Sequence, residues 1–308
     1  MKRMREISFV DTTLRDGHQS LWAKRMKTAH MLPIATVIDE AGFLAAELMG
    51  TVHFDACLRY LREDPWERIR LLAKALPNTP LRALIRSRSL TSFNIVPDSV
   101  IKLWIERCAA NGIRHLMIFD ALHDWSNLSK SVAVAKAVGI EVVVPLVYSL
   151  SPVHTDEFYA RKTAEMIKML NPDSVMIKDS IGLLTPERTK TLVPTIKGQI
   201  GDLPLEMHSH CTTGLAPLCC LDSVALGVDI IDTCVSPLAN GPSHPSIENM
   251  IMNLRRLGYT PKADEEAVKK MAEHFTYVAK REGKPMGAPV EYDLFQYIHQ
   301  VPGGMISN

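Results

Sequence analysis

The feature of this 308-residue chain that most limits its fold is a repeated alternation of short apolar runs with longer amphipathic stretches. The short runs are rich in β-branched residues and predict strands, whereas the stretches between them have the length and spacing of helices. The eight predicted strands are Ile7–Val10, Ala45–Met49, Leu81–Ile85, His115–Phe119, Glu141–Val147, Ser174–Ile177, Leu205–His208 and Asp229–Asp232. Strands that alternate with helices form parallel sheets, so we expect eight βα units.

Eight such units favour a closed (β/α)8 TIM barrel. The predicted helices are Lys27–Asp39, Pro65–Ala75, Asp98–Asn111, Ser126–Val138, Asp156–Leu170, Pro186–Gly198, Leu215–Ala225 and Ser246–Leu257. The alternative is an open doubly wound sheet, which more readily has a glycine-rich phosphate loop after its first strand. Here Val10 is followed by DTTLRDGHQS instead. We therefore expect the α/β barrel.

The chain is expected to divide into a barrel over residues 1–258 and a C-terminal extension over residues 259–308. Within the extension, Ala263–Glu282 has the pattern of a charged amphipathic helix, and the GKPMGAP segment after it predicts a loop. The apolar residues of the last segment have no partner strand among the eight. We expect this extension to be helical and to pack on the barrel.

Composition narrows the functional classes. Hydrophobic residues make up 46% and charged residues 22%, as in soluble globular proteins, and the net charge of +1 predicts no binding to nucleic acid. The sequence contains no run of eighteen uncharged apolar residues, so no membrane span is predicted. The apolar run before Asp11 is too short for a signal peptide. The six cysteines form no CxxC pair. We expect a cytoplasmic protein with a small-molecule substrate.

Polar residues gather at the predicted C-terminal ends of strands, where TIM barrels build their active sites. They are Arg15 and Asp16 after the first strand, Arg86 after the third, Lys178 and Asp179 at the sixth, and His208 and His210 at the seventh. Strand periodicity directs His208 and His210 to one side, as metal ligands require. Imidazole with the Asp16 carboxylate suits zinc, manganese or cobalt. The alternative is that each histidine satisfies a local hydrogen bond.

Lys178 ends an apolar strand, SVMIK, where a buried ammonium is costly unless it is paired or neutral. Two explanations are open. Asp179 forms a salt bridge with it, or the lysine is neutral and reacts with carbon dioxide, so that its carbamate becomes an anionic metal ligand.

Six motifs in order, DTTLRDGHQS, EDPWERI, SPVHT, MIKDSIGLL, HSHCTTGL and VPGGM, resemble those of the carboxyltransferase subunits of biotin-dependent enzymes. This family includes pyruvate carboxylase, the oxaloacetate decarboxylase alpha subunit and transcarboxylase, and the resemblance covers nearly the whole chain. It implies that Asp16, carbamylated Lys178, His208 and His210 bind a divalent metal. It also implies that Arg15, Gln19 and Arg86 bind the 2-oxo acid, and that Arg15 and Lys178 serve catalysis.

The resemblance implies carboxyl transfer between carboxybiotin on a partner and a small acid similar to pyruvate or oxaloacetate, through a metal-stabilised enolate. The sequence has no AMKM-like biotin site and no glycine-rich ATP loop. We therefore expect a biotin carrier protein and a biotin carboxylase subunit as partners, and a homodimer. Two other functions stay open: a biotin-independent lyase or decarboxylase of the same barrel superfamily, whose members lack the strand-6 lysine, and a non-catalytic assembly subunit.

Three positions depart from the family pattern. The loop after the last strand, CVSPLANGPSHPS, is expected to supply the threonine that shuttles a proton, but Gly241 or Pro242 stands there, and the nearby hydroxyl is that of Ser243. His53 and Arg88 lie in altered substrate-side motifs, MGTVH and RSRS. They suit a more negatively charged substrate if they face the pocket, and are unremarkable loop residues if they face solvent.

Overall fold

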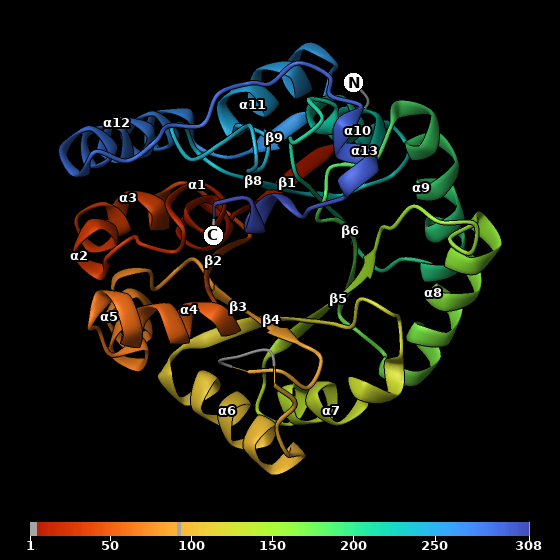
Figure 1. Cartoon of the computed structure of the whole chain (residues 1–308), viewed down its shortest axis with the longest axis horizontal. Helices are drawn as coiled ribbons and strands as arrows, with labels where there is room; N and C mark the ends of the chain where they lie inside the picture. Colours follow the sequence, from red (N-terminus) through yellow and green to blue (C-terminus); the bar gives the residue numbers. More distant parts are fainter. Residues whose placement is uncertain (1–4, 91–93, 308) are drawn as a thin grey trace.

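The computed structural model describes residues 5–90 and 94–307, so residues 1–4 at the start of the predicted barrel lie outside it. It confirms the TIM barrel (Figure 1). The strands are β1 (Glu6–Asp11), β2 (Ala45–Gly50), β3 (Leu81–Arg86), β4 (Ile113–Phe119), β5 (Glu141–Val147), β6 (Ser174–Asp179), β7 (Leu205–Ser209) and β8 (Ile230–Thr233). β1 pairs in parallel with both β2 and β8, which closes the ring and excludes the open sheet.

Helices surround the barrel, and several begin where a side chain caps their first free amides. The main ones are α5 (Pro65–Ala75), α6 (Asp98–Asn111), α7 (Ser129–Ala137), α8 (Asp156–Leu170), α9 (Pro186–Ile200), α10 (Ala216–Ala225), α11 (Ile247–Arg256) and α12 (Glu265–Glu282). The Asp64 carboxylate accepts from the Trp66 amide before α5, and the Thr155 hydroxyl accepts from the Phe158 amide before α8. The bounds predicted for α5, α6 and α8 are confirmed.

The helix predicted over Lys27–Asp39 is instead three short segments. They are α2 (Thr28–Met31), a 3-10 turn over Leu32–Ile34, and α3 (Ala35–Glu40). Pro33 lies in the middle turn, and proline has no amide hydrogen to continue the helical ladder. The periodicity of the sequence correctly predicts helical structure in this segment, but it does not predict the break at Pro33.

Short helical segments directly follow the first two strands and were not predicted. A π-helical turn over Thr13–Gly17 leads into α1 (His18–Trp22), and α4 (Thr51–Ala56) leads into a second π turn over Cys57–Leu61. Segments of five or six residues are too short to show a helical period. They matter because the first π turn holds Arg15 and Asp16, and such turns are frequent at functional sites.

The barrel interior contains a buried ion pair among its apolar side chains. Arg82 on β3 donates to both carboxylate oxygens of Glu206 on β7, at 2.5 and 3.0 Å, across the barrel. Both residues are buried, and two-point pairing of this kind satisfies charges that water does not reach. This pair forms a polar layer beneath the strand ends that carry the candidate site.

The C-terminal extension begins with β9 (Thr260–Lys262), which pairs with β1, and continues through α12. The chain then crosses the end of the barrel: the Gly287 amide donates to the Pro237 carbonyl at 2.8 Å and the Gly303 amide to the Ser180 carbonyl at 3.0 Å. A side chain at Gly287 would overlap the Ala239 carbonyl, so the approach requires glycine.

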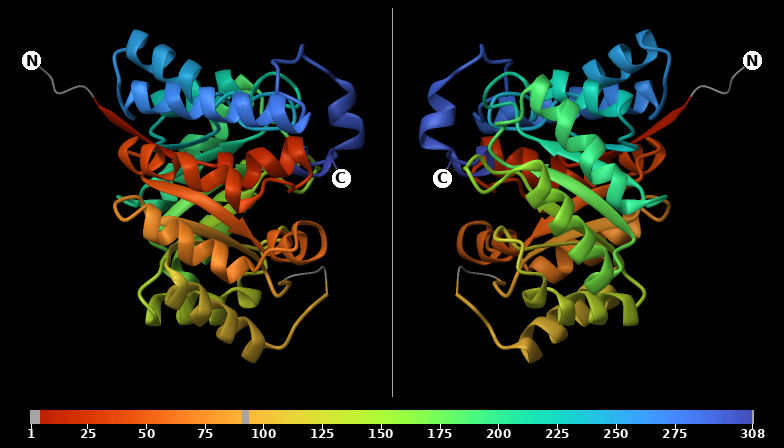
Figure 2. Two further views of the ribbon diagram at one scale, coloured as in Figure 1. Left: turned by 90° about the vertical axis from the view of Figure 1, so that its left-hand side faces the viewer. Right: turned by 90° about the vertical axis from the view of Figure 1, so that its right-hand side faces the viewer.

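Between those two anchors, the short helix α13 (Phe295–His299) projects beyond the barrel on this side (Figure 2). None of the helices within residues 5–90 and 94–307 has the length and apolar character to cross a bilayer. The extension thus packs on the barrel end, while the division of the chain at residue 258 stays a prediction.

Candidate active site

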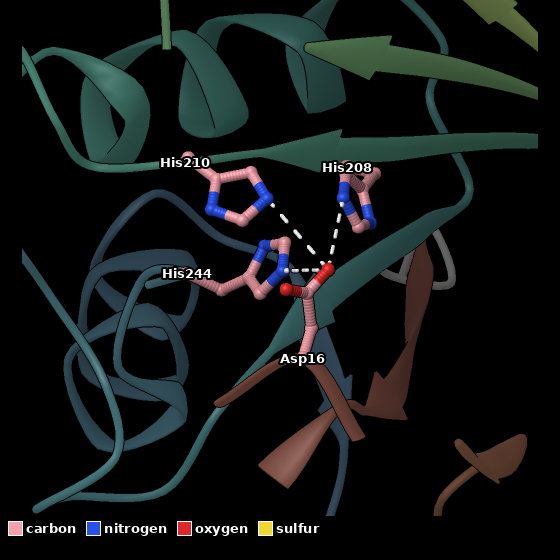
Figure 3. Close-up of side chains that lie close together, drawn as sticks. All are labelled: Asp16, His208, His210 and His244. Atoms are coloured by element: carbon pink, nitrogen blue, oxygen red, sulfur yellow. Dashed lines mark ion pairs between the residues drawn. The ribbon is translucent and has the colours of Figure 1, made fainter. Parts of the chain in front are cut away.

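Four buried side chains meet at the C-terminal ends of the strands (Figure 3). Asp16 comes from the π turn after β1, His208 from β7, His210 from just beyond β7, and His244 from the loop after β8. Their ligand atoms all lie within 4.8 Å of one another. Three of these residues were predicted to meet, and His244 was not.

The three imidazoles face one carboxylate oxygen. The Nε2 atoms of His244, His208 and His210 lie 3.2, 3.5 and 3.6 Å from Oδ2 of Asp16. Around an ion bound tetrahedrally at about 2.0–2.2 Å, neighbouring ligand atoms are about 3.3–3.6 Å apart. The spacing of the four groups therefore fits a divalent metal.

The hydrogen bonds on the other ring nitrogen support this fit. Each Nδ1 atom meets an acceptor: Asp232 at 2.6 Å for His208, the Pro242 carbonyl at 2.7 Å for His210, and the Ser209 carbonyl at 3.1 Å for His244. A neutral imidazole that donates from Nδ1 presents a lone pair at Nε2. Burial lowers the pKa of His208 and lowers that of His210 to about 3, so both are neutral at pH 7. Lone pairs that face a carboxylate repel it unless a cation lies among them.

Lys178 lies beside this cluster. Its strand position is in register with His208, and its Nζ atom is 2.8 Å from His208 Nε2. Burial, followed by the charge of Arg15, lowers the pKa of Lys178 to about 8. At pH 7 about a tenth of the lysine is thus neutral amine, which is the form that reacts with carbon dioxide.

Asp179 does not pair with Lys178, so the salt-bridge explanation is wrong. Adjacent strand residues face opposite sides, and the Asp179 carboxylate points away from the barrel axis, where it accepts from the Ser209 hydroxyl at 2.9 Å. It also accepts from the backbone amides of residues 182–184 at 2.9 to 3.0 Å. Asp179 therefore organises the turn after β6.

The predicted substrate residues share one cavity with the cluster. This cavity has a volume of about 830 Å³, and its lining includes Arg15, Asp16, Gln19, Arg86, Lys178 and His210. Arg15 is buried and bridges Asp16 at 2.8 Å and Glu47 at 2.6 Å. Gln19 donates to the Gly304 carbonyl at 3.2 Å, which ties the first strand end to the C-terminal segment. Arg15, Arg86 and two members of the cluster, Asp16 and His210, therefore border the same cavity.

Three further candidates lie elsewhere. The Ser243 hydroxyl is fully buried outside the cavity lining and donates to the Leu238 carbonyl at 2.6 Å. His53 is buried against the backbone, accepting from the Gly50 amide at 3.2 Å. Arg88 pairs with Asp98 at 3.5 Å in a separate surface cleft between α6 and α7. None of the three is among the residues that line the cavity, so the structure does not support a role for them there.

Two functional candidates were missed. His244 lies in the GPSHP loop, and the rule that active-site groups follow strands would have pointed to it as well as to Ser243. Ser307 is one of the residues that line the cavity, and its hydroxyl donates to the Gln19 carbonyl at 2.7 Å. It is brought there by the VPGGM segment, and no local pattern places residue 307 beside residue 19.

Comparisons with known proteins identify relatives of this chain. The family model described as HMGL-like matches residues 118–274. A pyruvate carboxylase subunit of Methanocaldococcus jannaschii is 41% identical over 98% of this chain and 53% of its own length. The 2-oxoglutarate carboxylase large subunit of Hydrogenobacter thermophilus is 34% identical over 99% of this chain and 47% of its own.

A solved structure shows the same architecture. The carboxyl transferase domain from Rhizobium etli pyruvate carboxylase, solved with pyruvate, superposes with a TM-score of 0.93 at 28% identity, over all of this chain and 52% of that one. The chain thus spans about half the length of the relatives it matches.

Proposed function

This chain belongs to the HMGL-like family, and from that premise we propose that it is the metal-dependent carboxyltransferase component of a biotin-dependent enzyme. Its motifs resemble those of carboxyltransferases, and proteins of that kind are among its relatives and structural neighbours. The proposal rests on one observation. A single cavity is lined by members of the metal-type cluster, by the partly neutral Lys178, and by Arg15 and Arg86.

The proposed substrate is a small 2-oxo acid, since the names of the relatives include both pyruvate and 2-oxoglutarate. Arg86 and Gln19 bind its carboxylate, because guanidinium and amide donors match the carboxylate oxygens. Arg15 donates toward the 2-oxo group, held in place by its bridges to Asp16 and Glu47. An enolate that forms there is stabilised by this fixed positive charge.

Asp16, His208, His210 and His244 would hold a divalent ion, and zinc, manganese and cobalt suit this donor set. Such an ion supplies positive charge beside the 2-oxo group. Lys178 lies against His208, and as a carbamate it would add an anionic oxygen to the same set. The bridge from Asp232 to His208 and the two carbonyl contacts of the other histidines hold the rings in place.

In the proposed reaction, loss of CO₂ from carboxybiotin breaks a nitrogen–carbon bond and leaves the electron pair on the ureido nitrogen. That nitrogen receives one proton from the carbon next to the 2-oxo group, and the resulting enolate forms a new carbon–carbon bond with CO₂. No oxidant or reductant is needed. We propose that the hydroxyl of Ser307 passes the proton, because Ser307 is one of the residues that line the cavity and Ser243 is not.

Carboxybiotin would reach the cavity on a biotin carrier protein loaded by a biotin carboxylase subunit. We propose both as partners, together with a homodimeric assembly in the cytoplasm. The cavity opens at the barrel end where the C-terminal segment crosses, with Pro302, Gly304 and Met305 in its lining. A carrier that delivers biotin would dock at this end.

Transfer of label tests the proposal. The metal-loaded chain is incubated with a carrier bearing ¹⁴C-carboxybiotin and with either pyruvate or 2-oxoglutarate. We expect label in an acid-stable carboxyl group of the product only when chain, metal and acid are all present. Arg15→Lys keeps a cation but loses the two-point contact, and serves as the impaired control. Label that leaves the carrier only as CO₂ in every reaction would contradict the proposal.

A further inference from the structure

His53 is not among the residues that line the cavity, but its ring contacts Arg15, which is. We propose that His53 is a positioning residue, which joins the end of β2 to the turn after β1 and thereby fixes where Arg15 presents its guanidinium. This inference rests on the proposed function, because it concerns the arginine proposed to stabilise the enolate. His53 lies in MGTVH, one of the motifs that depart from the family pattern.

Hydrogen bonds at both ring nitrogens orient His53. The Gly50 amide donates to Nδ1 at 3.2 Å, and Nε2 lies 3.2 Å from the Arg15 carbonyl oxygen. Burial, followed by the charge of Arg15, lowers the pKa of His53, so the ring is neutral at pH 7 and carries one proton. Because Nδ1 accepts from the Gly50 amide, that proton lies on Nε2, which therefore donates to the Arg15 carbonyl.

Packing also holds the His53 ring. His53 is buried, and the His18 ring of α1 lies edge-on against it, with the ring centroids 5.0 Å apart and the planes at 74°. A Cβ atom at Gly50 would lie 3.3 Å from His53 Nδ1 and 3.6 Å from Arg15 Cδ, so glycine leaves room there for both side chains. The His53 ring therefore has little freedom to turn away from Arg15.

Arg15 is held at its backbone and at its guanidinium. The guanidinium bridges Glu47 on β2 at 2.6 Å and Asp16 at 2.8 Å. The carbonyl accepts from His53 and also from the His18 amide, at the end of the π turn. A fixed charge stabilises an enolate only where it already points at the oxygen, and a displacement of about 1 Å can cost about 100-fold in rate. The bond from His53 fixes the backbone from which this charge projects.

His30 offers an internal comparison. Its Nδ1 accepts from the Lys27 amide at 3.2 Å at the start of α2, just as Nδ1 of His53 accepts from an amide at the start of α4. Its Nε2 instead lies 3.6 Å from Glu282, and neither of these two residues lines the cavity. The two histidines thus make the same contact at a helix start and differ in what the other nitrogen meets.

Two substitutions separate the two nitrogens of His53. Asparagine places an oxygen near the position of Nδ1 and keeps the Gly50 contact, but it does not reach the Arg15 carbonyl. Glutamine places an amide donor near the position of Nε2 and keeps the bond to Arg15. We compare His53→Asn, His53→Gln and the matched control His30→Asn with the unaltered chain, all loaded with metal. Circular dichroism and metal content check the fold and the site of each.

Calorimetry with oxalate and with pyruvate tests the position of Arg15 without turnover. Oxalate carries negative charge where the enolate oxygen of pyruvate forms, so it imitates the state that Arg15 stabilises. We expect His53→Asn to bind oxalate at least about tenfold more weakly, with a smaller change for pyruvate, and the kcat of carboxyl transfer to fall by a similar factor. His53→Gln should recover most of both losses, and His30→Asn should show neither.

Arg15→Lys supplies a test of coupling. If His53 acts through Arg15, adding His53→Asn to Arg15→Lys should weaken oxalate binding by less than about twofold further. A further loss as large as in the unaltered background would show that His53 acts apart from Arg15, and would overturn the inference.

Other results would overturn it as well. One is unchanged oxalate binding in His53→Asn, or no oxalate binding by the unaltered chain. Another is an equal loss in His53→Asn and His53→Gln, because the shape of the ring or the Gly50 contact would then matter instead of the bond to Arg15. Loss of metal from His53→Asn would place the effect on Asp16.

These binding results are separable from the proposed reaction. If no carboxyl group is transferred but oxalate binding depends on His53 as expected, the proposed function fails and the positioning role stands. If transfer occurs and His53→Asn binds oxalate as the unaltered chain does, this inference alone fails.

Discussion

The Nε2 atom of His244 lies 3.2 Å from Oδ2 of Asp16, closer than the Nε2 atom of either His208 or His210. The Nδ1 atom of His244 is bonded to the Ser209 carbonyl, so the ring is fixed with its other nitrogen toward the cluster. We infer that His244 contributes directly to metal binding, although it is not among the residues that the family resemblance assigns.

Replacing His244 with Ala should therefore weaken metal binding at least about tenfold, since one of four ligand atoms is removed. Metal content is measured after dialysis against graded concentrations of a chelator. His154→Ala is the control, because that histidine bonds the Ser151 hydroxyl and lies outside the cluster. Unchanged metal affinity in His244→Ala, with the ion still bound by the other three residues, would remove His244 from the ligand set.

Lys178 should be carbamylated in the presence of bicarbonate. Because burial and Arg15 lower its pKa to about 8, the ammonium dominates at lower pH and the reactive amine increases as the pH rises through this value. The carbamate signal from ¹³C-bicarbonate should therefore grow between about pH 7 and pH 9. Nuclear magnetic resonance of the metal-loaded chain measures it.

Substitutions test the role of that carbamate. Lys178→Glu should keep part of the metal and lose most activity, because a carboxylate remains but is shorter. Lys178→Ala should lose activity and bind the metal more weakly. A fully loaded metal site with no Lys178 carbamate signal at any pH would contradict the carbamate and would favour lyase chemistry.

Arg15 and Arg86 should affect different kinetic constants. Arg86→Ala removes a contact to the substrate carboxylate that exists before and during the reaction, so KM should rise, by about tenfold or more, with a smaller change in kcat. Arg15→Lys weakens stabilisation of the enolate, so kcat should fall by about 100-fold. Steady-state kinetics on metal-loaded protein separates the two. Small and equal effects from both would discredit the assignment of these arginines to the substrate.

The two serines give a further pair of matched variants. Ser307→Ala should lower the rate of carboxyl transfer by about 100-fold, because the hydroxyl proposed to pass the proton is removed, and Ser307→Thr should retain most of the rate. Ser243→Ala should leave the rate nearly unchanged and reduce stability instead, because its hydroxyl bonds the Leu238 carbonyl in the core. A loss of transfer in Ser243→Ala alone would reverse this assignment.

The barrel was predictable because strands and helices have different hydrophobic periods and alternate eight times along the sequence. Side-chain caps such as Thr155 also mark the starts of helices. His208 and His210 were predictable for the same reason, since alternation along β7 puts both on one side. The same alternation along β6 places the side chains of Lys178 and Asp179 on opposite faces of the strand. The sequence analysis did not use this and therefore kept a salt bridge between them as an alternative.

The rest of the site depends on contacts between distant segments. His244 reaches Asp16 across 228 positions through a loop, and Ser307 reaches Gln19 across 288. His53 and Arg88 were placed near the pocket by position alone, and only the fold shows that one is buried against the Gly50 amide and the other faces Asp98. Loop geometry of this kind leaves no periodic trace.

The most direct test of the account is whether decarboxylation of a 2-oxo diacid depends on biotin. Release of CO₂ from oxaloacetate is followed for the metal-loaded chain with and without free biotin, the simplest acceptor of the carboxyl group. Carboxyl transfer to biotin predicts that biotin stimulates this release and that removing the metal abolishes it. Release that is equally fast without biotin, or cleavage of a carbon–carbon bond to yield an aldehyde, would contradict carboxyl transfer as the function of this chain.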